Sequence, residues 1–120
     1  MDLLNDFQLT KNFNLREFEC SSTQQVKINP ELVDKLQKLR DELGQPVIIN
    51  SAYRSPDYNK QIGGVDGSQH TKGNAVDISL HNQELSAKEI VEIAERVGFD
   101  GIGVYENFIH LDVRGYPARW

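Results

Sequence analysis

The 120-residue sequence predicts an α+β fold, with a small and mostly antiparallel sheet and two main helices. Three observations indicate this class. Two segments carry apolar residues at helical spacing between capping residues, two short segments read as strands, and the C-terminal part reads as a hairpin. We expect a single domain over residues 1–120, in which residues 1–28 form an irregular arm packed on the rest.

The two main helices are marked at their ends. Asn29 as N-cap and Pro30 in the first turn predict the start of the first helix, and Gly44 predicts its end. Ser86 opens a capping box at the start of the second helix, which ends at Gly98. Both helices carry an apolar stripe at helical spacing, formed by Leu32, Val33, Leu36, Leu39, Leu43, Ile90, Ile93, Ala94 and Val97.

The predicted strands are short. Residues 47–50 are expected to form a short buried strand, and in residues 75–80 alternate side chains point to opposite faces. Residues 101–105 and 108–113 are expected to pair around a tight turn. The stretch 51–68 is polar, rich in Gly and Ser, and too long for a simple connection, which is typical of a functional loop.

Composition restricts the function. The formal net charge is -5, from 13 basic and 18 acidic residues without a basic cluster, so neither nucleic acid nor a membrane is the expected partner. No apolar run approaches the roughly 20 residues that span a bilayer. Cys20 is the single cysteine, which excludes an internal disulfide and a cysteine-based zinc site. We expect a monomer whose metal, if any, is held by His and carboxylate.

Polar residues interrupt two segments that otherwise look buried. Asp77 lies inside an apolar strand, and His110 and Asp112 alternate with apolar residues in the last predicted strand. A buried carboxylate costs several kcal/mol unless it is paired or bound to a metal. His70 precedes Asp77 by seven residues, with Gly73 between them to let the backbone turn. Two imidazoles and one carboxylate would leave a fourth position for water, as in catalytic zinc sites.

Three segments resemble the motifs of the M15 peptidases: SAYRS at 51–55, SQHTKGNAVD at 68–77 and FIHLD at 108–112. This family contains zinc D-Ala-D-Ala carboxypeptidases and related peptidoglycan endopeptidases. The resemblance covers nearly the whole chain and is closest to the short branch associated with phages and prophages. It implies a fold of the hedgehog/DD-peptidase type and Zn²⁺ bound by His70, Asp77 and His110.

The resemblance also implies that Arg54 binds the carboxylate of the substrate, a role that suits the planar guanidinium. The alternative for Arg54 is a structural role, either a surface ion pair with Asp57 or a cap at the C-terminal end of the preceding strand. Ser68, Gln69 and Tyr53 are expected to contact substrate. The aromatic residues considered for the walls of the cleft are Tyr53, Tyr58, Tyr105 and Trp120.

The sequence does not decide which residue is the general base. Many members of the family carry an acidic residue three positions before the last histidine ligand, where this chain has Asn107, which cannot accept a proton. Asp112, which matches the His-x-Asp pattern of the short branch, and Glu106 are the candidates. Asp112 is favoured slightly, with the alternative that it orients a ligand histidine or pairs with Arg54 or Arg114.

The predicted function is hydrolysis of a peptidoglycan stem-peptide bond by a zinc-dependent peptidase, of the carboxypeptidase or the endopeptidase (endolysin) type. The alternative is a non-catalytic, zinc-containing module of a phage or of cell-wall recognition. The first six residues lack the features of a secretion signal. We therefore expect a protein that acts at the bacterial cell wall after release from the cytoplasm, or after export by other means.

Overall fold

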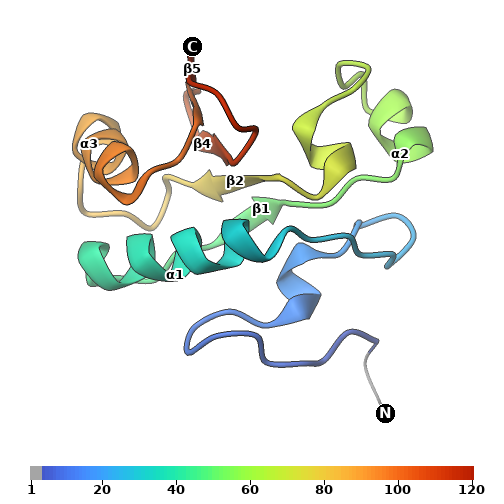
Figure 1. Cartoon of the computed structure of the whole chain (residues 1–120), viewed down its shortest axis with the longest axis horizontal. Coiled ribbons are helices and arrows are strands. Elements are labelled where there is room, and N and C mark those ends of the chain that lie inside the picture. Colours follow the sequence, from blue (N-terminus) through green and yellow to red (C-terminus); the bar gives the residue numbers. More distant parts are fainter. Residues whose placement is uncertain (1–3) are drawn as a thin grey trace.

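Five strands form one sheet in the computed structural model, which describes residues 4–120 (Figure 1). The strand order is β1-β2-β4-β3-β5, and every pairing is antiparallel except that of β3 with β5. The α+β class with a mostly antiparallel sheet is thereby confirmed. The strands are β1 (Ile49–Ser51), β2 (Ala75–Ser79), β3 (Gly101–Val104), β4 (Phe108–Asp112) and β5 (Ala118–Arg119).

The two predicted helices begin and end where their capping residues indicate. The side chain of Asn29 accepts the N–H of Glu31, and Gly44 ends the helix in the left-handed conformation. Ser86 and Glu89 form the predicted capping box. No helix within residues 4–120 is long and apolar enough to span a membrane. The helices are α1 (Pro30–Leu43), α2 (Pro56–Gln61) and α3 (Ala87–Val97), with 3₁₀ turns η1 (Leu15–Phe18) and η2 (Gln69–Lys72).

One element inside the predicted loop 51–68 was missed. Ser55 caps α2 through a hydrogen bond to the N–H of Tyr58, and Pro56 occupies its first turn. The same two signals mark α1, but six residues are too few to show a helical stripe. The N-terminal arm is also more ordered than expected, because Asn14 and Glu17 form a capping box on η1. Residues 1–3 of the arm lie outside the described residues.

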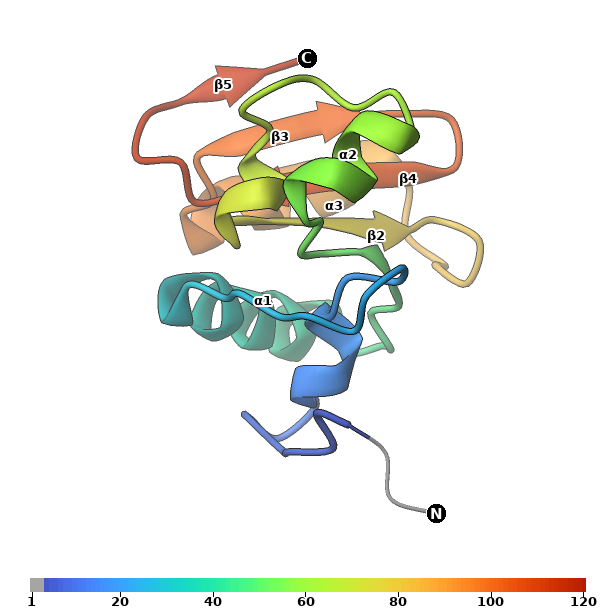
Figure 2. The ribbon, with the colours of Figure 1, turned by 90° about the vertical axis from the view of Figure 1, so that its right-hand side faces the viewer.

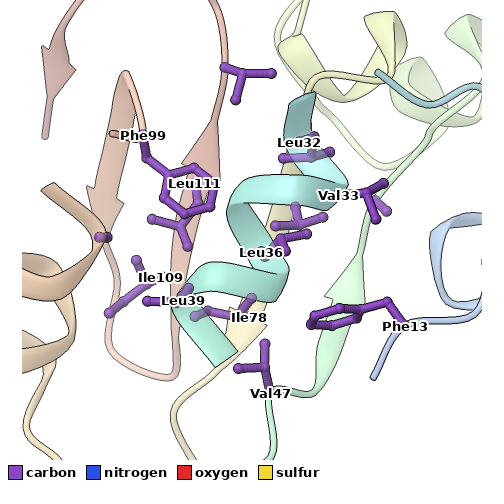
Figure 3. Close-up of a cluster of buried hydrophobic side chains, with 14 of the residues drawn as sticks. Phe13, Leu32, Val33, Leu36, Leu39, Val47, Ile78, Phe99, Ile109 and Leu111 are labelled. Carbon is purple, nitrogen blue, oxygen red and sulfur yellow. The ribbon is translucent and has the colours of Figure 1, made fainter. Parts of the chain in front are cut away.

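The hydrophobic core lies between one face of the sheet and the helices α1 and α3 (Figure 3). Val76, Ile78, Ile109 and Leu111 point to this side, since they are cross-strand neighbours on β2 and β4. They pack with the apolar stripe of α1, and each fully buried aliphatic side chain contributes about 1.5–3 kcal/mol. Figure 3 shows Ile78, Ile109 and Leu111 together with side chains of α1, which are those of Leu32, Val33, Leu36 and Leu39.

The opposite face of the sheet carries the polar residues. In the strand register Asp77 is directly opposite His110, and His110 is opposite Gly103. Asp112 follows two residues later on the same face, between Ala75 and the next strand. The segment with α2 and η2 crosses in front of this face in Figure 2, while α3 lies behind the sheet. One face of the sheet therefore belongs to the hydrophobic core, and the other face carries Asp77, His110 and Asp112.

Candidate metal centre

His70, Asp77 and His110 converge on one point. They come from η2, β2 and β4, all three are buried, and one ligand atom of each lies within 4.8 Å of the others. Oδ1 of Asp77 is 3.1 Å from Nε2 of His70 and 3.2 Å from Nδ1 of His110. Two imidazole nitrogens and one carboxylate oxygen match the donor set of catalytic zinc sites.

The outer nitrogen of each imidazole is already engaged. Nδ1 of His70 lies 2.7 Å from the carbonyl oxygen of Ala52, which can only accept, so this nitrogen carries the proton. Nε2 of His110 lies 2.7 Å from Oδ2 of Asp112 and donates to it in the same way. Each ring thereby directs its remaining nitrogen toward Asp77, which is the arrangement that a bound metal requires.

The electrostatics of the three residues also suit a cation. Burial by itself would raise the pKa of Asp77, but hydrogen bonds from His110 and His70 outweigh burial and lower this pKa to about 2. Burial would lower the pKa of His110, and its hydrogen bonds to Asp112 and Asp77 raise it instead. Asp77 is thus held as a carboxylate between two imidazoles, a set of donors that suits a divalent cation.

Arg54 holds the other oxygen of the carboxylate. Its Nη2 lies 3.3 Å from Oδ2 of Asp77, Nε donates to Oγ of Ser51 at 3.1 Å, and Nη1 donates to Oδ1 of Asn59 at 3.3 Å. The ion pair is thus with Asp77, and not with Asp57. Since Oδ2 is occupied by the guanidinium, Oδ1 is the oxygen directed at the two histidines.

A cleft of about 590 Å³ opens above the three residues. Of the residues expected to contact substrate, Arg54, Ser68 and Gln69 line it, as do the aromatic candidates Tyr105 and Trp120. Tyr53 and Tyr58 are not among its lining residues. The lining residues not singled out from the sequence include Lys72, Phe108, Arg114 and Tyr116.

Asp112 lies behind His110 and not in the cleft. It is fully buried, and its two oxygens accept hydrogen bonds from His110, from the N–H of Gly101 and from the backbone and guanidinium of Arg114. These bonds outweigh its burial and hold the pKa of Asp112 far below the usual range of a carboxyl. The geometry therefore matches the alternative weighed for Asp112, a partner of a ligand histidine and of an arginine.

Glu106 is exposed in the turn between β3 and β4, and it does not line the cleft. It is adjacent in sequence to Tyr105, whose ring stacks on Phe108 at a centroid distance of 4.4 Å. Both rings line the cleft. Within residues 4–120, Asp77 is the only carboxylate among the lining residues, so the structure places neither candidate base directly in the cleft.

The far wall of the cleft is built by the C-terminal residues. The ring of Trp120 lies 5.0 Å from that of His110, and its indole N–H donates to the hydroxyl of Tyr105 at 2.7 Å. The guanidinium of Arg114 lies over the rings of both Trp120 and Tyr116, at 5.0 and 5.6 Å. Arg114 is itself fixed by Asp112, so Asp112 supports both this wall and the candidate ligand His110.

Comparison with known proteins agrees with the resemblance that the three motifs indicated. A family model described as Peptidase M15 matches residues 8–112. The chain is 38% identical over 101 residues to the peptidoglycan L,D-endopeptidase MepK of Escherichia coli (strain K12), across 77% of this chain and 53% of that protein. It is 33% identical over 90 residues to the zinc D-Ala-D-Ala carboxypeptidase of Streptomyces albus G, across 72% of this chain and 34% of that protein. The chain thus spans about half the length of the E. coli relative.

Proposed function

The chain belongs to the peptidase M15 family, as its motifs predicted, and from this premise we propose that it is a zinc-dependent peptidase that hydrolyses a stem-peptide bond of peptidoglycan. The observation that carries the proposal is the convergence of His70, Asp77 and His110 at a cleft. One relative is named as a peptidoglycan L,D-endopeptidase and the other as a zinc D-Ala-D-Ala carboxypeptidase. We favour an endopeptidase, because the relative with the higher identity is named as one.

Zinc supplies Lewis-acid chemistry when bound, by polarising a carbonyl and activating a water molecule. His70, Asp77 and His110 would hold it, with the donor atoms fixed by Ala52, Arg54 and Asp112 respectively. Arg54 uses three of its five N–H groups within the protein. The remaining two are available at the cleft for a substrate carboxylate or for the oxyanion that develops during hydrolysis.

For the proton acceptor we favour Glu106 over Asp112. Both oxygens of Asp112 are taken by strong donors, whereas Glu106 is exposed beside the stacked rings of Tyr105 and Phe108. A glutamate side chain that turns across these rings enters the cleft. In this proposal Asp112 acts as a positioning residue for His110.

The test is digestion of defined muropeptides by the zinc-loaded protein, with identification of the products by mass spectrometry. Cleavage of a peptide bond in the stem is expected, and the product mass names the bond. His70→Ala and His110→Ala should abolish cleavage without loss of the far-UV circular dichroism of the fold. Cleavage by either variant at the wild-type rate would contradict the proposed site.

The second candidate function is a wall-binding or phage structural module of the same fold. It is favoured by the absence, within residues 4–120, of a cleft-lining carboxylate besides Asp77, and by Asn107 three positions before His110. The same digestion separates the two functions, because a binding module would retain muropeptides without forming product. An endolysin role would further require that the purified protein lyse cells whose outer barrier has been removed.

A further inference from the structure

Asn59 is a buried polar side chain outside the cleft. It lies on α2, is 2% exposed, and does not line the cleft or touch the three converging residues. Its Oδ1 accepts from Nη1 of Arg54 at 3.3 Å, and its Nδ2 donates to the carbonyl oxygen of Val65 at 2.9 Å. Arg54 can only donate and a carbonyl can only accept, so this orientation of the amide is the one that satisfies both partners.

The amide therefore joins two parts of the site. Through Arg54 it reaches Oδ2 of Asp77, which leaves Oδ1 directed at His70 and His110. Through Val65 it holds the glycine-rich rim of the cleft, residues 63–67. The backbone of Asn59 also accepts the N–H of Gly64 at 2.8 Å.

The rim packs directly on this side chain. A Cβ on Gly64 would overlap the amide group of Asn59, so the rim approaches as closely as a glycine allows. Gly63, Gly64, Val65 and Gly67 all line the cleft. A substitution at Asn59 would therefore alter the position of the Arg54 guanidinium and that of the 63–67 rim.

We propose that Asn59 is a positioning residue that sets Arg54 against Asp77 and fixes the 63–67 rim, so that it acts on metal affinity and on substrate binding without contacting either. The proposal rests on the proposed metal site but not on the identity of the bond that is cut. Removal of a group that orients a metal ligand typically costs 10–100-fold in metal affinity. Because Asn59 acts through Arg54, we expect the lower end of this range, about 10-fold.

Two variants separate the two connections. Asn59→Ala removes both hydrogen bonds, while Asn59→Asp is nearly isosteric, keeps an oxygen acceptor for Arg54, and places a second oxygen where Val65 needs a donor. Gln61→Ala, at an exposed position of the same helix, is the matched control. The protein is titrated with Co²⁺, whose visible absorption reports both affinity and coordination geometry, and KM and kcat are measured on the muropeptide that the wild type cleaves fastest.

Asn59→Ala should bind Co²⁺ about 10-fold more weakly, with an altered spectrum, whereas Asn59→Asp and Gln61→Ala should stay within about 3-fold of the wild type. Asn59→Asp should raise KM several-fold with little change in kcat. Wild-type Co²⁺ affinity and spectrum in folded Asn59→Ala would overturn the proposal. If Asn59→Ala does not fold, an unchanged KM in Asn59→Asp overturns it.

The outcomes are distinct from those of the proposed function. A wild-type protein that binds Co²⁺ but cleaves no muropeptide would contradict the peptidase, and the Co²⁺ titration would still decide the role of Asn59. A wild-type protein that binds no Co²⁺ would overturn both the proposed peptidase and the proposed role of Asn59.

Discussion

The direction of each donor atom at this site is decided by a neighbour that is not itself a ligand. An imidazole has two nitrogens, and a carbonyl or carboxylate beside one of them leaves the other for the metal. Ala52 does this for His70, and Asp112 does it for His110. Arg54 does the equivalent for Asp77 by occupying one carboxylate oxygen. The three candidate ligand atoms are thus already directed toward one another.

Asp112→Asn tests whether this carboxylate orients His110 or serves as the base. In the wild type both carboxylate oxygens of Asp112 accept hydrogen bonds. The substitution replaces one of these oxygens by an NH₂ group that faces the same donors, so we expect zinc affinity to fall by 10–100-fold. At saturating zinc the rate of muropeptide cleavage should recover to within about 10-fold of the wild type, since loss of a general base typically costs 10²–10⁴-fold. The measurements are a zinc titration followed by kcat at saturating metal.

Glu106→Gln is the paired variant. It should leave zinc affinity at the wild-type value and lower kcat by about 100-fold or more if Glu106 accepts the proton. The reverse pattern, in which Asp112→Asn binds zinc normally but is inactive and Glu106→Gln is fully active, would assign the base to Asp112.

At the residue level, the sequence indicated candidates where a residue type was out of place. Asp77 and His110 are conspicuous because they interrupt apolar strands, and the structure brings them together with His70. Asn59 gives no such signal, because an asparagine in a polar loop is ordinary and its burial comes from chain packing. Arg114 is similar: its partner Asp112 was in view, but the wall that it forms with Trp120 depends on the path of the C-terminus.

At the scale of the elements, antiparallel pairing assembles the site. The register that puts Val76 opposite Leu111 in the core also puts Asp77 opposite His110 on the other face. A slip of one residue would exchange the two faces, so the packing of the core fixes the geometry of the site. The next strand contributes Gly103 opposite His110, and the absence of a side chain there admits the indole of Trp120.

Gly103→Ala tests this fit. A Cβ at this position would overlap the indole ring, so the ring must leave its place beside His110 or the strands must shift. Overpacking of this kind typically costs about 1–3 kcal/mol. Trp120 is the only tryptophan in the chain, so its fluorescence reports the displacement directly, and we expect a red-shifted emission together with a lower melting temperature.

The control is Val104→Ala, one residue further on the same strand, where the side chain is 47% exposed. It should leave the emission maximum unchanged. An unchanged emission in Gly103→Ala would show that the indole does not occupy the place described.

Prediction of the elements from the sequence depended on length and on local signals. Both long helices were predicted because an apolar stripe lies between an N-cap and a C-cap residue. The hairpin was predicted because apolar and polar residues alternate along its strands. α2 has an N-cap and a proline in its first turn but is too short for an apolar stripe. β5 has two residues and pairs parallel to β3, so neither element has a periodic pattern to recognise.

At the scale of the whole molecule, the proposed metal would add a further link between parts of the chain that hydrogen bonds and packing already join. His70 belongs to a loop segment on the polar face, whereas Asp77 and His110 belong to central strands of the sheet. A ligand that binds only the folded state stabilises it by mass action, by about 4 kcal/mol at a thousand times its Kd. Removal of zinc should therefore lower the stability of the whole fold.

We expect zinc in excess to raise the melting temperature of the chelator-treated wild type by on the order of 15 °C, since about 1 kcal/mol corresponds to several degrees in a protein of this size. His70→Ala should lose most of this shift. Val33→Ala, which removes buried methyl groups from α1 in the hydrophobic core, should melt lower than the wild type both with and without zinc and should keep the shift. Differential scanning calorimetry provides the measurement. An equal zinc shift in His70→Ala and the wild type would place the stabilising ion elsewhere, because the shift measures binding to the folded state and a site that lacks one of three ligands cannot bind with unchanged affinity.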